Sequence, residues 1–305
     1  MSSRYRYLHL DVFTGEKFGG NQLAVFLDAR GLAAGTMQAM TKEMNFSEST
    51  FILPAERPDT DIRMRIFTPG REMPMAGHPT VGSAFALALS GVIPAGRKRW
   101  VFGLNVGPTP VDIDWEGERP TFAWMTQLKP VFGPVVADME AAARAVGLDA
   151  DAVLATGLPV QEVSCGVPFV FIPLATRAQV DAALPNLSAF EELCAAAGVD
   201  NHAMFVFSRE PCPDGATVYS RMFAPGLGVF EDPATGSASG PLGCYLVKHG
   251  VVPPDRAGTI LSLQGVKMGR PSRVHIAIGV ESGEITRVQV GGEAVLMGEG
   301  YLSVS

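Results

Sequence analysis

Residues 65–70 read RIFTPG, and residues 221–226 read RMFAPG. A second match follows each of them, PTVGSA at 79–84 and PATGSA at 233–238. The first pair is offset by 156 residues (65 to 221) and the second by 154 (79 to 233), about half of the 305-residue chain. Because only two copies are present, the repeat predicts a duplicated domain and not a solenoid.

The second match pairs two ionisable residues. It sets His78 opposite Asp232, and each directly precedes a proline. Two equivalent loops that carry different ionisable groups indicate one cleft between two related halves. The sequence therefore predicts that both side chains line that cleft.

The composition favours a cytoplasmic protein of two domains. Hydrophobic residues make up 47% of the chain and charged residues 18%, so each half can bury a core. The net charge of −7 argues against a nucleic-acid-binding face. No apolar stretch is long enough to span a membrane, and the first residues are not typical of a signal peptide.

The cysteines argue against disulfides and against a metal site. All four lie in the second half without CxxC spacing, which favours reduced and mostly buried thiols. No histidine pair has the HxxxH or HxH spacing of metal ligands. We therefore expect neither a bound metal nor a zinc-stabilised fold. The cysteines are Cys165, Cys194, Cys212 and Cys244.

Two apolar segments at equivalent places predict two central helices. Residues 80–93 and 236–249 are apolar nearly all round, and a helix without a polar face must be buried. Strand-like runs surround each of them, so each half is expected to be strands wrapped around one helix. The expected first half is 1–120 with returning strands in 285–305, and the second is 121–284. Residues 115–134 are expected to connect them.

The beginnings of both helices are candidate anion sites. A proline lies near the expected first turn of each, a position that proline favours. The exposed N–H groups of a helix N-terminus bind anions, so Gly77, Gly236 and Ser237 are candidates to hold a carboxylate. The alternative is simple capping, because Asp232 and Ser237 are residue types that cap helices.

Glu48 lies between an expected helix and an expected strand, and the preceding Ser47 is a candidate to bind the substrate. Residue type alone favours a surface role for such a carboxylate. The alternative role is a general acid and base.

Several motifs together resemble the phenazine biosynthesis PhzF-like family, and they occur in the same order along the whole chain. The resemblance implies an α+β fold with two pseudo-symmetric halves, each a mixed sheet curled around a central apolar helix, as in diaminopimelate epimerase. The motifs are GNQLAV (20–25), NFSESTF (45–51), AGHPTVG (76–82), EDPATGSA (231–238), QG (264–265) and MGRPS (268–272).

The resemblance also implies an activity and a site. The best-known member of the family isomerises trans-2,3-dihydro-3-hydroxyanthranilate without a cofactor or metal, and the family is dimeric. Its catalytic glutamate, histidine and aspartate correspond to Glu48, His78 and Asp232, and its serine corresponds to Ser237. Gln22 and Met75 differ from the residues common in the family, and Met75 adjoins the His78 loop.

Moving a proton along a conjugated system requires a group that removes it and returns it elsewhere. A carboxyl group whose pKa is raised by partial desolvation can do both. We therefore expect an isomerase with Glu48 as the proton shuttle. Two alternatives stay open: an epimerase or racemase on the same fold, and a non-catalytic protein that binds a small ligand. A racemase with two thiols is disfavoured, because no cysteine lies at either helix entrance.

Overall fold

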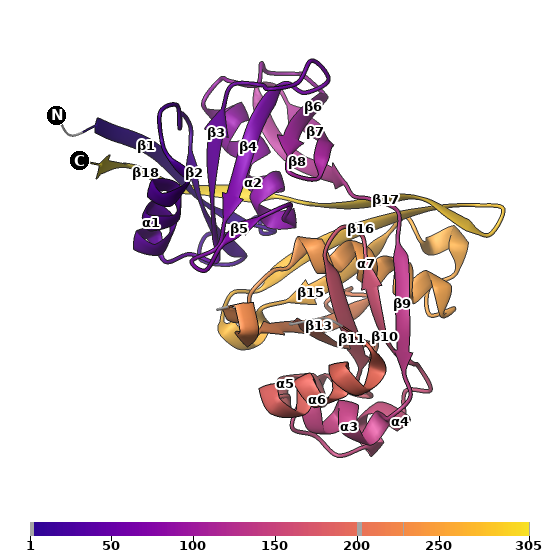
Figure 1. Ribbon diagram of the computed structural model, residues 1–305. Coiled ribbons are helices and arrows are strands. Elements are labelled where there is room, and N and C mark those ends of the chain that lie inside the picture. The colour runs from indigo at the N-terminus through magenta and orange to yellow at the C-terminus, as the bar shows by residue number, and fades with distance from the viewer. Residues whose placement is uncertain (1–2, 200–202, 228, 305) are drawn as a thin grey trace. The chain divides into compact units, whose positions relative to one another are not determined.

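The computed structural model describes residues 3–199, 203–227 and 229–304, which form two compact units (Figure 1). Unit 1 comprises Met1–Thr126 and Val290–Ser305, and unit 2 comprises Gln127–Gln289. The boundaries expected from the sequence were 120/121 and 284/285. The first boundary instead follows β8 (Arg119–Thr126), because residues 115–134 contain strands and only 127–130 connect β8 to β9 (Val131–Val136).

Unit 1 is a mixed sheet that packs on one apolar helix, α2 (Gly77–Leu89). The strands pair in the order β18–β1–β2–β3–β4–β6–β7–β8. The pairs β2–β3 and β4–β6 are parallel, and the others are antiparallel. The remaining elements are β1 (Ser3–Val12), β2 (Asn21–Phe26), α1 (Ala34–Met44), β3 (Glu48–Leu53), β4 (Ile62–Phe67), β5 (Glu72–Met73), β6 (Arg99–Leu104), β7 (Gly107–Glu116) and β18 (Ala294–Val304).

Helix α2 is buried because its sequence has no polar face. Every residue from Gly77 to Ala88 is buried, and none is ionisable except His78. Strands β1, β2, β3, β7 and β8 all contact this helix. A Cβ at Gly82 would lie 2.6 Å from side-chain atoms of both Leu23 and Val12, so the glycine permits this close approach. The predicted central helix of the first half is therefore confirmed, although it begins three residues earlier than expected, at Gly77 instead of residue 80.

Unit 2 contains a second mixed sheet and a second buried helix, α7 (Gly236–Lys248). The strands pair in the order β9–β10–β11–β12–β13–β15–β16, with β11–β12 and β13–β15 parallel. Strands β10, β11 and β16 contact α7. The other elements are α3 (Met139–Ala145), α4 (Asp151–Leu154), β10 (Val160–Ser164), β11 (Pro168–Pro173), α5 (Arg177–Ala182), α6 (Leu187–Ala197), β12 (Met204–Ser208), β13 (Val218–Ala224), β14 (Val229–Asp232), β15 (Ile260–Gln264), β16 (Ser272–Glu281) and β17 (Glu284–Gly292).

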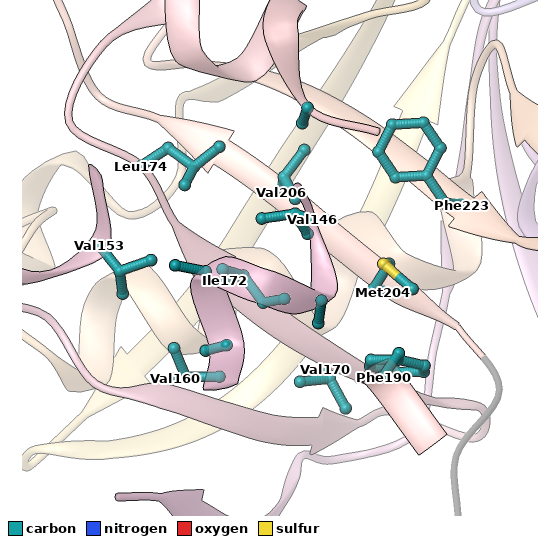
Figure 2. Close-up of a cluster of buried hydrophobic side chains, with 14 of the residues drawn as sticks. Val146, Val153, Val160, Val170, Ile172, Leu174, Phe190, Met204, Val206 and Phe223 are labelled. Atoms are coloured by element: carbon teal, nitrogen blue, oxygen red, sulfur yellow. The ribbon is translucent and has the colours of Figure 1, made fainter. Parts of the chain in front are cut away.

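A second layer of helices covers part of the unit 2 sheet. Figure 2 shows the cluster of buried side chains in this layer, to which helices α3, α4 and α6 and strands β10 to β13 contribute. Phe190 of α6 and Phe223 of β13 are among its fully buried members. This cluster is separate from the one that contains the apolar residues of α7.

The two units repeat one pattern of strand pairing. In each, a hairpin is followed by one helix (unit 1) or two (unit 2), a parallel strand, an antiparallel strand, the central helix and a further hairpin. In each unit a forked ion pair also ties together the two strands before the central helix, from Arg65 to Glu72 and from Arg221 to Glu231. The first sequence match, RIFTPG with RMFAPG, begins on equivalent strands, β4 and β13, and continues past the end of each.

The register of the second sequence match is wrong. Met73 pairs with Ile66 on β4, whereas Asp232 pairs with the equivalent Met222 on β13. The connection from Met222 to Asp232 is ten residues long, against seven from Ile66 to Met73, so the offset grows by three. Met73 is therefore the equivalent of Asp232.

The first residues of the two central helices support the same corrected alignment. Because α2 begins at Gly77 and α7 at Gly236, the equivalent of His78 is Ser237. Pro233 consequently lies before α7, whereas Pro79 lies within the first turn of α2; the proline inside α7 is Pro241.

Candidate active site

The entrance of α2 brings together three polar side chains of unit 1. The His78 Nδ1 atom lies 3.3 Å from Oε2 of Glu48 and 3.1 Å from Nδ2 of Asn21. Asn21 opens β2 and Glu48 opens β3, and the parallel register of these strands sets Leu23 beside Glu48. The sheet therefore holds the two side chains close to the first turn of the buried helix.

His78 is a neutral imidazole in this setting. Its side chain is 3% exposed, and burial lowers its pKa from 6.5 to about 3, although the backbone carbonyl of Gln22 acts in the opposite direction. At neutral pH its contact with Glu48 is thus not an ion pair. The Glu48 side chain is 15% exposed, so it keeps limited access to water.

The residue that precedes α2 does not cap the helix with its side chain. This residue, Ala76, is extended, and its side chain offers no acceptor. Thr80 instead donates its hydroxyl proton to the Ala76 carbonyl at 2.7 Å. The positive end of the helix dipole therefore lies at the entrance that carries His78, where Ala76 supplies no side-chain cap.

The entrance of α7 carries a different polar network within unit 2. The Asp232 carboxylate accepts a hydrogen bond from the Thr235 hydroxyl at 2.6 Å. Gln264 donates to the Asp232 carbonyl at 2.7 Å and to the Thr235 hydroxyl at 3.0 Å, and it accepts from the Thr235 backbone at 3.0 Å. Asp232 is 5% exposed, and this network fixes its position before the helix.

Gly236 and Ser237 form the first turn of α7. The Gly236 carbonyl accepts a hydrogen bond from the Gln127 amide at 2.9 Å. Thr235 precedes the helix, but its side chain does not cap it. The partly exposed Ser237 hydroxyl makes no hydrogen bond within residues 3–199, 203–227 and 229–304, so simple capping by Ser237 is not observed.

The structure thus gathers the predicted residues into two groups. Glu48 and His78 meet in unit 1, with Ser47 and Gly77 next to them in the chain, while Asp232, Gly236 and Ser237 lie close together along unit 2. The expectation that both groups line one cleft stays a prediction. Sequence reasoning missed Asn21, Thr235 and Gln264, although each lies inside one of the family motifs.

Three further observations concern the chain as described. No helix in the described ranges is long and apolar enough to cross a membrane. Within the same ranges, no group of three or more histidine, cysteine, aspartate or glutamate side chains is arranged to hold a metal ion. Cys165, Cys194 and Cys244 are buried free thiols, whereas Cys212 is exposed.

Known proteins are similar to this chain along nearly its whole length. An uncharacterized isomerase of Mesorhizobium japonicum is 38% identical over 301 residues, covering 98% of both chains. Trans-2,3-dihydro-3-hydroxyanthranilate isomerase of Pseudomonas aeruginosa is 34% identical over 296 residues, covering 97% of this chain and 98% of the relative.

Solved structures extend the likeness to the fold. A Bacillus anthracis phenazine biosynthesis protein of the PhzF family superposes with a TM-score of 0.87 at 28% identity, covering 99% of this chain and 100% of the other. A probable proline racemase of Agrobacterium radiobacter gives a TM-score of 0.71 at 11% identity, covering 99% and 93% of the two chains, and shows the fold alone. The family model described as phenazine biosynthesis-like protein, PhzC-PhzF, matches residues 10–300, and the chain belongs to this family.

Proposed function

We propose that the protein is a cofactor-independent isomerase that moves a proton within a small carboxylate-bearing substrate. Glu48 takes the proton from a saturated carbon next to a double bond. The electron pair of the broken C–H bond shifts along the conjugated system, and Glu48 returns the proton to a carbon further along it. The substrate and product are isomers, and the Glu48 carboxyl group ends the cycle as it began. The reaction therefore needs no oxidant or reductant.

The observation that supports this proposal is the contact between Glu48 and His78. A carboxylate oxygen lies 3.3 Å from a ring nitrogen that stays neutral at physiological pH. A neutral neighbour does not hold Glu48 in its ionised form as a cation does, and partial shielding from water favours proton exchange with a substrate. Glu48 can therefore alternate between a base and an acid during one turnover.

The substrate carboxylate is proposed to bind at the helix entrances. Neither α2 nor α7 is capped by the side chain of the residue that precedes it, and helix N-termini attract anions. Backbone N–H groups at Gly77 and Gly236 and the hydroxyl groups of Ser47 and Ser237 are the proposed donors. Asp232, fixed by Thr235 and Gln264, is proposed to bind an amino or hydroxyl group of the substrate.

The first substrate to test is trans-2,3-dihydro-3-hydroxyanthranilate, because a relative that is 34% identical is named for its isomerisation. Small unsaturated carboxylates and amino acids form the panel around it. The reaction is followed by NMR in D₂O, where migration of the double bond and entry of deuterium at the receiving carbon are both visible. Deuterium is expected to enter, since Glu48 is partly exposed and can exchange its proton with water between the two transfers.

The decisive variant is Glu48→Gln, which keeps the shape of the side chain and removes its basicity. Turnover should fall roughly 10²–10⁴-fold, the usual contribution of a general acid and base. The matched control is Glu43→Gln, an exposed glutamate on α1 whose loss should leave turnover unchanged. Full activity of Glu48→Gln contradicts the proposal, and inversion of a stereocentre without double-bond migration indicates an epimerase.

A further inference from the structure

Asn21 is a buried amide at the first position of β2, and the chain before it fixes where it lies. Residue Asn21 pairs with Val12 on β1. Gly20 has a φ of +62°, and a Cβ there would lie 2.3 Å from the Val12 carbonyl oxygen. A larger residue at position 20 would clash with the backbone of β1. Glycine therefore allows the tight turn that places Asn21 at the start of β2.

The contact between Asn21 and His78 determines which ring nitrogen carries the proton. Nδ2 of Asn21 lies 3.1 Å from Nδ1 of His78. An amide nitrogen can only donate, so Nδ1 must accept. A neutral imidazole has one N–H and one lone pair, so the ring proton resides on Nε2. Within the described part of the chain, no acceptor meets this buried Nε2 at ordinary hydrogen-bond geometry, although the backbone of Gln22 interacts with the ring.

The same lone pair faces Glu48. Oε2 of Glu48 is 3.3 Å from Nδ1. If Nδ1 is an acceptor, it attracts a protonated carboxyl group, which can donate to it, and repels an ionised one. The opposite tautomer, with the proton on Nδ1, would donate to the carboxylate and hold it ionised. The choice of tautomer therefore changes how readily Glu48 keeps a proton.

We propose that Asn21 is a positioning residue that keeps His78 in the Nε2–H tautomer and thereby favours the proton-bearing form of Glu48. The role of Glu48 in this inference rests on the proposed function, whereas the tautomer itself does not. Asn21 acts through His78, and the group that it affects is the protonated carboxyl of Glu48.

The first test reads the tautomer directly in the free protein. Two-bond ¹⁵N–¹H spectra of ¹⁵N-histidine-labelled protein distinguish Nδ1–H from Nε2–H, and His78→Gln identifies the signals of His78. The expected result at pH 7 is the Nε2–H pattern. An Nδ1–H pattern, which an amide turned the other way would produce, overturns the proposal. This measurement needs no substrate and no variant at Asn21.

Asn21→Asp reverses the polarity of the contact with almost no change in shape. A carboxylate accepts, so the ring proton should move to Nδ1, and the added charge should raise the pKa of His78. The control is Asn186→Asp, which makes the same change at the residue that caps α6, where aspartate caps equally well. It should leave the His78 signals unchanged, and an unchanged tautomer in Asn21→Asp overturns the proposal.

The kinetic test uses Asn21→Ala, which releases the ring to donate to Glu48. We expect kcat to fall by at least about tenfold, a part of the usual contribution of an acid–base group. KM should change little, and the acidic limb of the kcat profile should move to lower pH. If the pH profile of kcat is the same in Asn21→Ala as in wild type, the proposed effect of Asn21 on Glu48 is wrong. Full activity of Glu48→Gln, with the expected tautomer still present, would instead count against the proposed function alone.

Discussion

The entrances of α2 and α7 share a frame and differ in where they place an ionisable group. Each follows a short strand that a forked arginine pair ties to its neighbour, and each leads into a buried helix of 13 residues. At α2 the ionisable group is His78, inside the first turn. At α7 it is Asp232, on the strand before the helix, while the helix itself carries Ser237.

This difference indicates that the duplicated frame and the chemistry are set by different residues. The frame depends on strand pairing, buried helices and forked ion pairs, which both units retain. The proposed chemistry depends on the few residues around the first turn, where the units differ. A neutral imidazole beside a carboxylate suits proton transfer, whereas an aspartate held by hydroxyl and amide donors suits binding.

The largest expected effect compares the two carboxylates. Asp232→Asn should lower turnover by about tenfold, because it replaces a charged acceptor by a neutral one, a loss of about 1.5 kcal/mol. That is less than the roughly 10²–10⁴-fold expected for Glu48→Gln. Steady-state kcat of both single variants and the double variant would also measure their coupling. A loss from Asp232→Asn equal to that from Glu48→Gln would reverse the assignment of roles.

The two forked pairs should differ in their contribution to stability. Arg221 is 5% exposed at its side chain, against 21% for Arg65, and it also donates to three backbone carbonyls. Lysine cannot form the fork, so Arg221→Lys should lower the free energy of unfolding by about 3 kcal/mol. Arg65→Lys should cost about 1 kcal/mol. Urea unfolding checks this, and equal losses would contradict the difference in burial.

His78 should make stability depend on pH. The unfolded chain takes up a proton on this histidine near its ordinary pKa of 6.5, whereas burial lowers the pKa of the folded form to about 3. The stabilisation is thus complete above pH 6.5 and is lost as the pH falls toward 3. Between pH 7 and pH 5, wild type should lose about 2 kcal/mol more than His78→Gln. Ser237→Ala, at the equivalent position of α7, should behave as wild type, and identical slopes for wild type and His78→Gln would contradict the burial.

The sequence predicted the two buried central helices better than it predicted which residues of the two units are equivalent. Both central helices are buried as expected, because an apolar surface without a polar face has few alternatives. The register of the second match was wrong, since local identity between 79–84 and 233–238 conceals the longer turn before Asp232. That turn length is set by pairing across the sheet, which a linear alignment does not see.

Residue types at the site were easier to predict than their partners. Glu48 and His78 are 30 positions apart, and their contact depends on the β2–β3 register and on the packing of α2. Asn21 lies inside the GNQLAV motif, but nothing in the sequence distinguishes it from the other residues of that motif. Its significance comes from a 3.1 Å contact that only the folded chain reveals.

The smallest expected effects test the corrected register. Thr80 and Ser239 each donate a hydroxyl proton to the carbonyl of the residue before their helix, at 2.7 and 2.9 Å. They are equivalent if Gly77 matches Gly236, because each is the fourth residue of its helix. Thr80→Val and Ser239→Ala should therefore cost similar amounts, about 1 kcal/mol each.

The control for this pair is Ser90→Ala, which removes a hydroxyl bond to the Leu87 carbonyl at the partly exposed end of α2. Exposure lets water replace the lost bond, so this change should cost less than either buried one. Urea unfolding of the three variants gives the comparison. The alignment of 79–84 with 233–238 would instead match Thr80 to Ala234, and it predicts no relation between Thr80 and Ser239. Equal losses at these two positions, both larger than that of Ser90→Ala, support the register set by the helix starts. A loss at Thr80 with none at Ser239 would mean that the two entrances do not share the same first turn.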